Sequence, residues 1–165
     1  MKPRALFYFL SFSVLLASCG DNSEYTTDKQ TIRFVELGHG TAREDAGYHS
    51  KDVSDDKSST NDFVIADETD TIEAKQGARF GVRYTLESNE ESSVALRQVW
   101  TFPDSVHDED GNVYKEDSYE VNKTPNEETY ASYQLDYPYE LIRGKWMLRI
   151  YYKKHLLYRK VFVLR

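Results

Sequence analysis

The sequence is poor in residues that would cross-link it or supply a common catalytic motif. Cys19 is the single cysteine among 165 residues, so no intrachain disulfide can form and the fold must depend on an apolar core. The chain has no glycine-rich phosphate loop, no His-Glu-x-x-His zinc motif and no serine in a nucleophile-elbow context. These absences favour a protein that is not an enzyme and carries no cofactor.

Histidine is scarce, and its spacing argues against a metal centre. The four histidines fall in separate segments, without the paired spacing of a zinc site: His39, His49, His107 and His155. We therefore interpret them as solvated loop residues.

The chain has fewer basic residues than acidic ones, 21 Lys and Arg against 28 Asp and Glu. The chain has a formal net charge of −7, and loss of residues 1–18, which hold Lys2 and Arg4 but no acidic residue, would change this to −9. An acidic chain is repelled by phosphate groups, so we expect no nucleic-acid partner. The same balance argues against tight electrostatic docking on anionic lipid headgroups.

The amino-terminal residues are typical of a bacterial lipoprotein signal peptide. Lys2 and Arg4 precede an apolar run that ends near Leu16 and is too short to span a bilayer. The sequence Leu16-Ala-Ser-Cys19 then resembles the lipobox, whose cysteine is acylated and becomes the first mature residue. We expect acyl chains such as palmitate on Cys19 to anchor the protein in a membrane. Gly20 stands where inner-membrane lipoproteins carry Asp, which favours the periplasmic face of the outer membrane.

Composition divides the mature chain into a tether and one domain. Residues 19–30 are polar and without periodicity, which predicts a flexible tether after lipidated Cys19. Residues 31–165 are enough for a single domain. Within it, residues 42–62 hold almost no apolar side chains and predict a mobile polar loop.

The domain shows the period of two that is typical of β-strands. Trp146, Leu148 and Ile150 share one parity, and polar side chains occupy the other. Similar runs, separated by turn residues, lie at 31–37, 63–66, 79–86, 94–102, 113–121, 128–135 and 156–164. We predict an all-β fold, an antiparallel β-sandwich of about seven strands, in which Pro103 ends the strand that begins at Val94.

The carboxyl-terminal hairpin leaves its register open. Regular pairing across Lys154 and His155 would place Arg159 in the core and Phe162 outside. A β-bulge near Arg159 would reverse this parity and bury Phe162. We prefer the bulge.

Three motifs resemble a known bacterial family. Residues 79–86, 99–103 and 133–146 are similar in order and spacing to the family catalogued as domain of unknown function 3859. The resemblance is good over residues 71–165 and loose over 31–42. It implies an immunoglobulin-like sandwich with no assigned activity, cofactor or catalytic residue.

The candidate binding residues come from strand parity. If the strands at Val94 and Trp146 share a sheet, their outward side chains form a basic and aromatic face, which Tyr158 and Lys160 of the last strand would join. Such a face suits an envelope protein or an anionic glycan. Its proposed members are Arg97, Arg149, Tyr151, Tyr158 and Lys160. The alternative is that these side chains simply cover the sheet and pair with loop acids.

Two other candidate sites are weaker. Asp108, Asp110 and Asn112 present oxygens at alternate positions around Gly111 and form a possible Ca²⁺ loop, although the distal bidentate Glu is missing. Glu140 lies in a turn and is expected to be solvated. We therefore predict a membrane-anchored, non-catalytic binding or accessory module of the bacterial envelope. The alternatives are a calcium-dependent structural module or a wall-polymer hydrolase.

Overall fold

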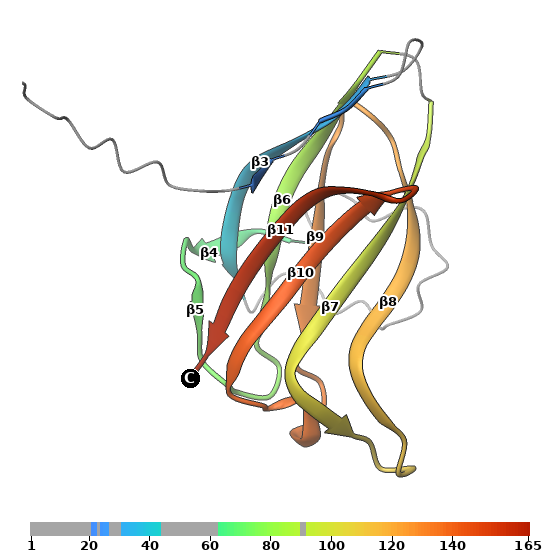
Figure 1. The fold of residues 1–165 in the computed structure, drawn as a ribbon. Coiled ribbons are helices and arrows are strands. Elements are labelled where there is room, and N and C mark those ends of the chain that lie inside the picture. Colours follow the sequence, from blue (N-terminus) through green and yellow to red (C-terminus); the bar gives the residue numbers. More distant parts are fainter. Residues whose placement is uncertain (1–20, 23, 27–30, 44–62, 90–91) are drawn as a thin grey trace, which may run out of the picture.

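The computed structural model describes residues 21–22, 24–26, 31–43, 63–89 and 92–165, and it consists of two β-sheets packed face to face (Figure 1). We call them sheet A and sheet B. Their longer strands lie side by side along the length of the molecule. Among the described residues, no helix is long and apolar enough to cross a bilayer.

Sheet A is built around the carboxyl-terminal hairpin. Its strand order is β1-β11-β10-β7-β8, with β5 paired to the end of β11. Every pair is antiparallel except β5 with β11. The strands are β1 (Asp21–Asn22), β5 (Thr71–Ile72), β7 (Val94–His107), β8 (Val113–Lys123), β10 (Gly144–Tyr152) and β11 (His155–Leu164).

Sheet B closes the other side of the core. Its order is β2-β3-β6-β9, with β4 paired to the end of β3. The strands are β2 (Glu24–Thr26), β3 (Thr31–Ala42), β4 (Ile65–Asp67), β6 (Arg79–Ser88) and β9 (Glu128–Gln134). Seven strands of the two sheets have seven residues or more, so the predicted sandwich of about seven strands is confirmed.

Aromatic side chains hold the two sheets together. The ring of Phe80 from sheet B meets the rings of Trp100, Trp146 and Phe162 from sheet A edge-on, with centroids 5.5, 6.0 and 5.1 Å away. All four side chains are completely buried. Because each aromatic ring removes a large apolar area from water, this cluster supplies the cohesion that a chain without disulfides requires.

The register of the hairpin follows the bulged alternative. Ile150 lies opposite Tyr158 and Tyr151 opposite Leu156, so Leu157 is the extra residue of a β-bulge. The bulge lies two residues before the predicted position at Arg159. Its effect on parity is the predicted one, because Phe162 is buried opposite Trp146 while Arg159 is exposed.

Pro103 does not end its strand, contrary to our prediction. β7 continues to His107, and its pairing with β8 is interrupted between Thr101 and Val106. Pro103 lies in this interruption, where its missing N–H is not needed for the ladder. The Pro103 ring also packs closely against Gly144. A Cβ atom added to Gly144 would lie only 2.7 Å from Pro103 Cβ, so this position has no room for a side chain.

The segment predicted as a flexible tether contributes to both sheets. β1 pairs with β11 through Asp21 and Arg159, and β2 pairs with β3 through Tyr25 and Ile32. The prediction is therefore wrong for the five residues of these two strands, because unpaired edges of β11 and β3 were available to them. Cys19, the signal peptide and residues 44–62 of the predicted mobile loop lie outside the described residues.

Glu140 is buried, not solvated as we expected. It ends the short 3₁₀ helix η2 (Pro138–Glu140), and only 1% of it is exposed. Its carboxylate accepts hydrogen bonds from the Tyr133 hydroxyl at 2.8 Å and from the backbone N–H groups of Asp136 and Tyr137 at 2.7 and 3.0 Å. Glu140 thus fixes the corner between β9 and β10, a role that its place in a predicted turn did not indicate.

Replacement of Glu140 should destabilise the fold. In Glu140→Ala the Tyr133 hydroxyl and two backbone N–H groups lose their acceptor, which should lower the free energy of unfolding by about 2 to 4 kcal/mol. Urea denaturation measures this change. The exposed Glu127→Ala is the matched control and should stay within about 0.5 kcal/mol of the parent. Equal stability of the two variants would show that the corner does not depend on this carboxylate.

Candidate functional site

The outward side of sheet A brings together three of the predicted binding residues. Arg97 on β7 lies opposite Tyr151 on β10, and Arg149 lies two positions before Tyr151 on the same strand. The guanidinium of Arg97 stands over the Tyr151 ring, 4.6 Å from its centroid. These three residues therefore lie on one side of sheet A, as the strand parity predicts.

Arg149 is held in place by three neighbours. Its Nη2 donates to Thr101 Oγ1 at 2.7 Å and to Glu116 Oε2 at 3.2 Å, and its Nη1 donates to the Tyr151 hydroxyl at 3.3 Å. The side chain remains 29% exposed and that of Glu116 52%. An ion pair this exposed contributes little to stability, so it leaves Arg149 available to another anion.

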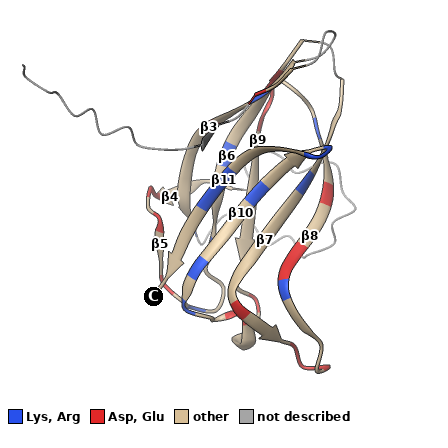
Figure 2. Ribbon diagram, in the orientation of Figure 1, with Lys and Arg blue, Asp and Glu red and all other residues tan. Residues whose placement is uncertain are grey.

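Two further basic residues belong to the same surface. Arg159 lies directly opposite Arg149, and the exposed Lys145 has the same parity on β10. We call the five residues Arg97, Lys145, Arg149, Tyr151 and Arg159 the basic face. Figure 2 shows Lys and Arg along β7, β10 and β11, and both signs of charge along the neighbouring β8, which holds Glu116, Asp117 and Glu120 together with Lys115 and Lys123.

Tyr158 and Lys160 do not join this face, contrary to our prediction. The bulge at Leu157 reverses the parity of β11, so both side chains turn between the sheets. Tyr158 is completely buried and stacks on Phe34 with centroids 4.3 Å apart. Lys160 is only 16% exposed and pairs with Asp70 at 2.8 Å.

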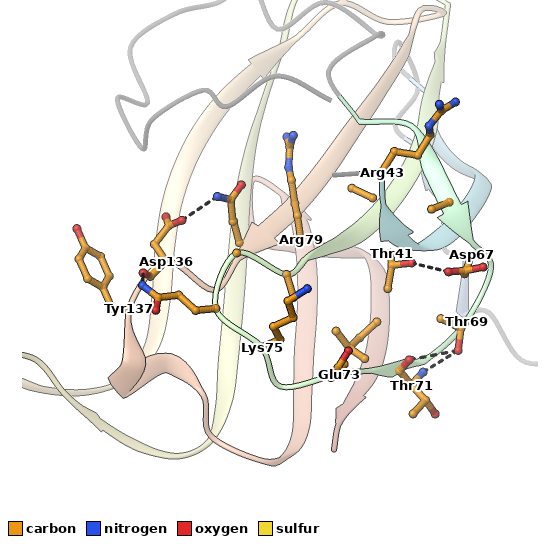
Figure 3. A pocket seen from close by; sticks show the side chains of 17 residues that line it. Thr41, Arg43, Asp67, Thr69, Thr71, Glu73, Lys75, Arg79, Asp136 and Tyr137 are labelled. Atoms are coloured by element: carbon orange, nitrogen blue, oxygen red, sulfur yellow. Dashed lines mark hydrogen bonds between the residues drawn. The ribbon is translucent and has the colours of Figure 1, made fainter. Parts of the chain in front are cut away.

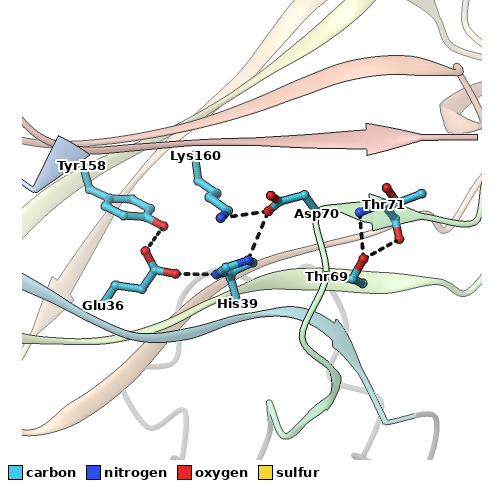
Figure 4. A network of polar contacts seen from close by, with 7 residues as sticks. All are labelled: Glu36, His39, Thr69, Asp70, Thr71, Tyr158 and Lys160. Atoms are coloured by element: carbon cyan, nitrogen blue, oxygen red, sulfur yellow. Dashed lines mark hydrogen bonds and ion pairs between the residues drawn. The ribbon is translucent and has the colours of Figure 1, made fainter. Parts of the chain in front are cut away.

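These two residues enter a polar network that links the sheets (Figure 4). The Tyr158 hydroxyl donates to Glu36 at 2.8 Å, and the other oxygen of Glu36 lies 2.5 Å from Nδ1 of His39. The Nε2 atom of His39 lies 3.1 Å from Oδ1 of Asp70. The same carboxylate oxygen forms an ion pair with the ammonium group of Lys160. The network therefore connects β11 of sheet A with β3 of sheet B and with the residue before β5.

His39 is not the solvated loop residue that we expected, because its side chain is only 19% exposed. The residue lies within β3, where Glu36 pairs with Tyr84 and Gly38 with Arg83, so Leu37 is an extra residue. This bulge turns Glu36 and His39 to the same side of the strand. The glycines beside His39 were the available signal: at Gly40 an added Cβ would lie 1.9 Å from the Asp67 carbonyl oxygen, so the backbones of β3 and β4 approach closely there.

A hollow of about 1290 Å³ lies at one end of sheet B (Figure 3). It opens among the ends of β3, β4 and β9 and the segment between β5 and β6. Its charged lining is balanced, with three basic and three acidic side chains: Arg43, Lys75, Arg79, Asp67, Glu73 and Asp136. The hollow therefore does not select a ligand by the sign of its charge.

The candidate calcium loop is a hydrogen-bonded turn. Asp108 Oδ1 accepts from the backbone N–H groups of Asp110 and Asn112 at 3.0 and 2.8 Å, and Oδ2 accepts from the Asn112 amide at 2.9 Å. The Asn112 side chain and these N–H groups lower the pKa of Asp108 below its ordinary value. Within the described part of the chain, no group of three His, Cys, Asp or Glu side chains is placed to hold a metal ion.

Buried tyrosines are the groups whose protonation the fold changes most. Burial raises the pKa of Tyr84, and burial together with Glu140 or Glu36 raises the pKa of Tyr133 and of Tyr158. Burial also raises the pKa of Tyr119, to about 12. These hydroxyls stay protonated in the folded chain at a pH where an unfolded chain has lost their protons.

The free energy of unfolding should therefore fall above about pH 10. Below this pH the hydroxyls are protonated in both states and contribute no pH dependence; above it, unfolding releases their protons. Each such tyrosine contributes a slope of about 1.4 kcal/mol per pH unit. In urea denaturation the parent and Tyr158→Phe should show the same slope between pH 8 and 9, and between pH 10 and 11 the slope of Tyr158→Phe should be smaller by up to about 1.4 kcal/mol per pH unit. The same slope in both proteins over this upper range would contradict the assignment.

The family follows from the match of the whole domain. Residues 30–164 match the model of the Domain of unknown function (DUF3859) family. The chain belongs to this family. The resemblance seen in the three motifs is thus confirmed, and the family carries no assigned activity. No curated protein sequence matches the chain.

Solved structures confirm the fold class of this family member. An immunoglobulin-like protein from Pseudomonas aeruginosa is similar over 78% of this chain and 90% of its own, with a TM-score of 0.60 and 22% sequence identity. At this identity the likeness shows the fold alone, which is the predicted immunoglobulin-like sandwich. An alkylpurine DNA glycosylase from Pseudomonas fluorescens, solved bound to DNA containing an abasic-site analogue, covers 58% of this chain and 27% of its own. Its identity of 14% and TM-score of 0.36 are too low to support an inference.

Proposed function

We propose that this DUF3859 protein is a non-catalytic module of the bacterial cell envelope that binds an anionic partner through the basic face. The observation that carries the proposal is the position of Arg97. Among the described residues, its guanidinium contacts the Tyr151 ring and no carboxylate. An exposed arginine that is oriented by an aromatic ring is a common element of recognition surfaces.

The second element of the proposed site is the replaceable partner of Arg149. Thr101 and Tyr151 orient the guanidinium, while Glu116 occupies its outer side from an exposed position. A carboxylate, sulfate or phosphate of a partner can take the place of Glu116, because a planar guanidinium binds such groups in a fork. An envelope protein with acidic segments and an anionic glycan both have this chemistry.

The envelope location rests on the amino-terminal sequence. The signal peptide and the lipobox ending at Cys19 support a lipoprotein whose mature chain begins at that cysteine. We propose acylation of Cys19 and attachment to the periplasmic face of the outer membrane. The immunoglobulin-like fold and a family of unknown function are compatible with such a module.

The alternatives have weaker support. The carboxylate of Asp108 already accepts three hydrogen bonds within its turn, so a calcium ion would have to replace them. The buried carboxylate of Glu140 is committed to the corner after β9. Neither group is therefore a good candidate for calcium binding or for glycoside hydrolysis.

Retention on anionic matrices tests the proposed site. The mature chain, residues 19–165 with Cys19→Ser, is applied to immobilised heparin and to immobilised polyglutamate at low salt. We expect retention despite the acidic composition, and elution as added salt shortens the Debye length to about 10 Å near 0.1 M. The double variant Arg97→Glu/Arg149→Glu should pass through both columns.

The control carries the same kind of charge change elsewhere. Lys115 is exposed on β8 and points to the side opposite Glu116, so Lys115→Glu should be retained like the parent. All variants should unfold at the same temperature within a few degrees, since surface changes rarely exceed about 0.5 kcal/mol. A parent chain that passes through both columns, or a double variant that is retained, would refute the site.

A further inference from the structure

The structure places the basic face beside the point where the chain leaves for Cys19. We infer that the anionic partner of this face is the headgroup surface of the membrane that holds the anchor. The inference deepens the proposed function and rests on it, including the acylation of Cys19. It names phospholipid headgroups as the ligand and assigns the domain an orientation on the bilayer.

The path from anchor to sheet is short. Asp21 pairs with Arg159 and Asn22 with Tyr158, so the chain joins β11 two residues after Cys19. Two trans peptide units span at most about 7.6 Å between Cα atoms. An acylated Cys19 would therefore bring the bilayer surface to the β1 and β11 side of sheet A, with no tether between them.

The order of the strands then places positive charge near the anchor. In one row across sheet A, Asp21 is followed by Arg159, Arg149, Val99 and Ser118 on successive strands. Neighbouring strands lie about 4.8 Å apart, so Arg159 and Arg149 lie about 5 and 10 Å from β1, and β8 lies about 19 Å away. Glu116 and Glu120 of the outward side are on this distant strand, while Asp21 lies directly opposite Arg159 on β1.

The net charge of the chain does not describe this surface. Charges separated by more than a Debye length, about 8 Å at physiological salt, are largely screened from one another. A sheet inclined with its β11 side toward the bilayer brings Arg159 and Arg149 near the headgroups and keeps the backbone of β8 farther out. The Glu116 side chain reaches from β8 to Arg149, so a headgroup phosphate would replace this carboxylate there. On this side Asp70 is already paired with Lys160 and His39. The acidic composition of the whole chain therefore does not rule out headgroup binding at this surface.

The remaining side chains of this surface suit a lipid interface. Tyr151 and Met147 are half-buried on either side of Arg149 along β10, and Leu156, opposite Tyr151, is 38% exposed. Aromatic side chains with a polar end are favoured at the boundary between headgroups and water. Arginine forks bind phosphate oxygens. A second, electrostatic contact would also make attachment by acyl chains more stable and would fix the orientation of the domain.

Vesicle flotation tests this inference without the anchor. The mature chain with Cys19→Ser is mixed at low salt with vesicles of phosphatidylcholine that contain about 30% phosphatidylglycerol, or with phosphatidylcholine alone. We expect the protein to float with the anionic vesicles only, and to be released by salt. In Arg149→Glu/Arg159→Glu the partition coefficient should fall at least about 25-fold, because each basic residue near the surface contributes a factor of about five.

The control and the column experiment separate the possible outcomes. Lys115→Glu should float like the parent, and thermal unfolding should confirm that each variant is folded. A chain that binds heparin or polyglutamate but not the anionic vesicles overturns the membrane assignment and leaves an acidic protein segment or a glycan as the partner. A chain that binds neither refutes the proposed function as well. Equal binding to both kinds of vesicle refutes the role of the basic face.

Discussion

A single inserted residue, Leu157, determines which side chains of β11 meet the opposite sheet. Because successive residues of a strand point to opposite faces, one extra residue exchanges the inward and outward sets. Leu157 and Tyr158 are consequently both buried, Phe162 lies against Trp146, and Arg159 faces outward. A regular hairpin would turn the charged guanidinium of Arg159 toward the core, where desolvation of a charge is costly.

The inter-sheet network and the basic face both depend on this register. With the bulge in place, Tyr158 and Lys160 reach Glu36 and Asp70 across the gap between the sheets. The same register aligns Arg159 with Arg149, which extends the positive surface from β7 to the strand that pairs with the amino-terminal segment. The core and the candidate site are thus two consequences of one local irregularity.

Much of the fold could be predicted because alternation of apolar side chains reports burial directly. Residues 145–152 and 79–86 show this pattern, and their inward sides form the core. Bulges and corners have a weaker signal: the parity of Phe162 indicated a bulge in the last strand, but not its position at Leu157. Leu157 and Leu37 each break the alternation. The positions predicted from the sequence for Tyr158, Lys160 and His39 were therefore wrong. Their positions, like that of the buried Glu140, follow from contacts between segments distant in the sequence.

Cross-strand nuclear Overhauser effects in the mature chain test the register most directly. The account predicts backbone contacts between Ile150 and Tyr158 and between Trp146 and Phe162, since these residues lie opposite one another. Contacts of Ile150 with Arg159 and of Trp146 with Val163 would show a regular hairpin instead. That result would contradict the bulge, and with it the assignments of the core, the network and the basic face.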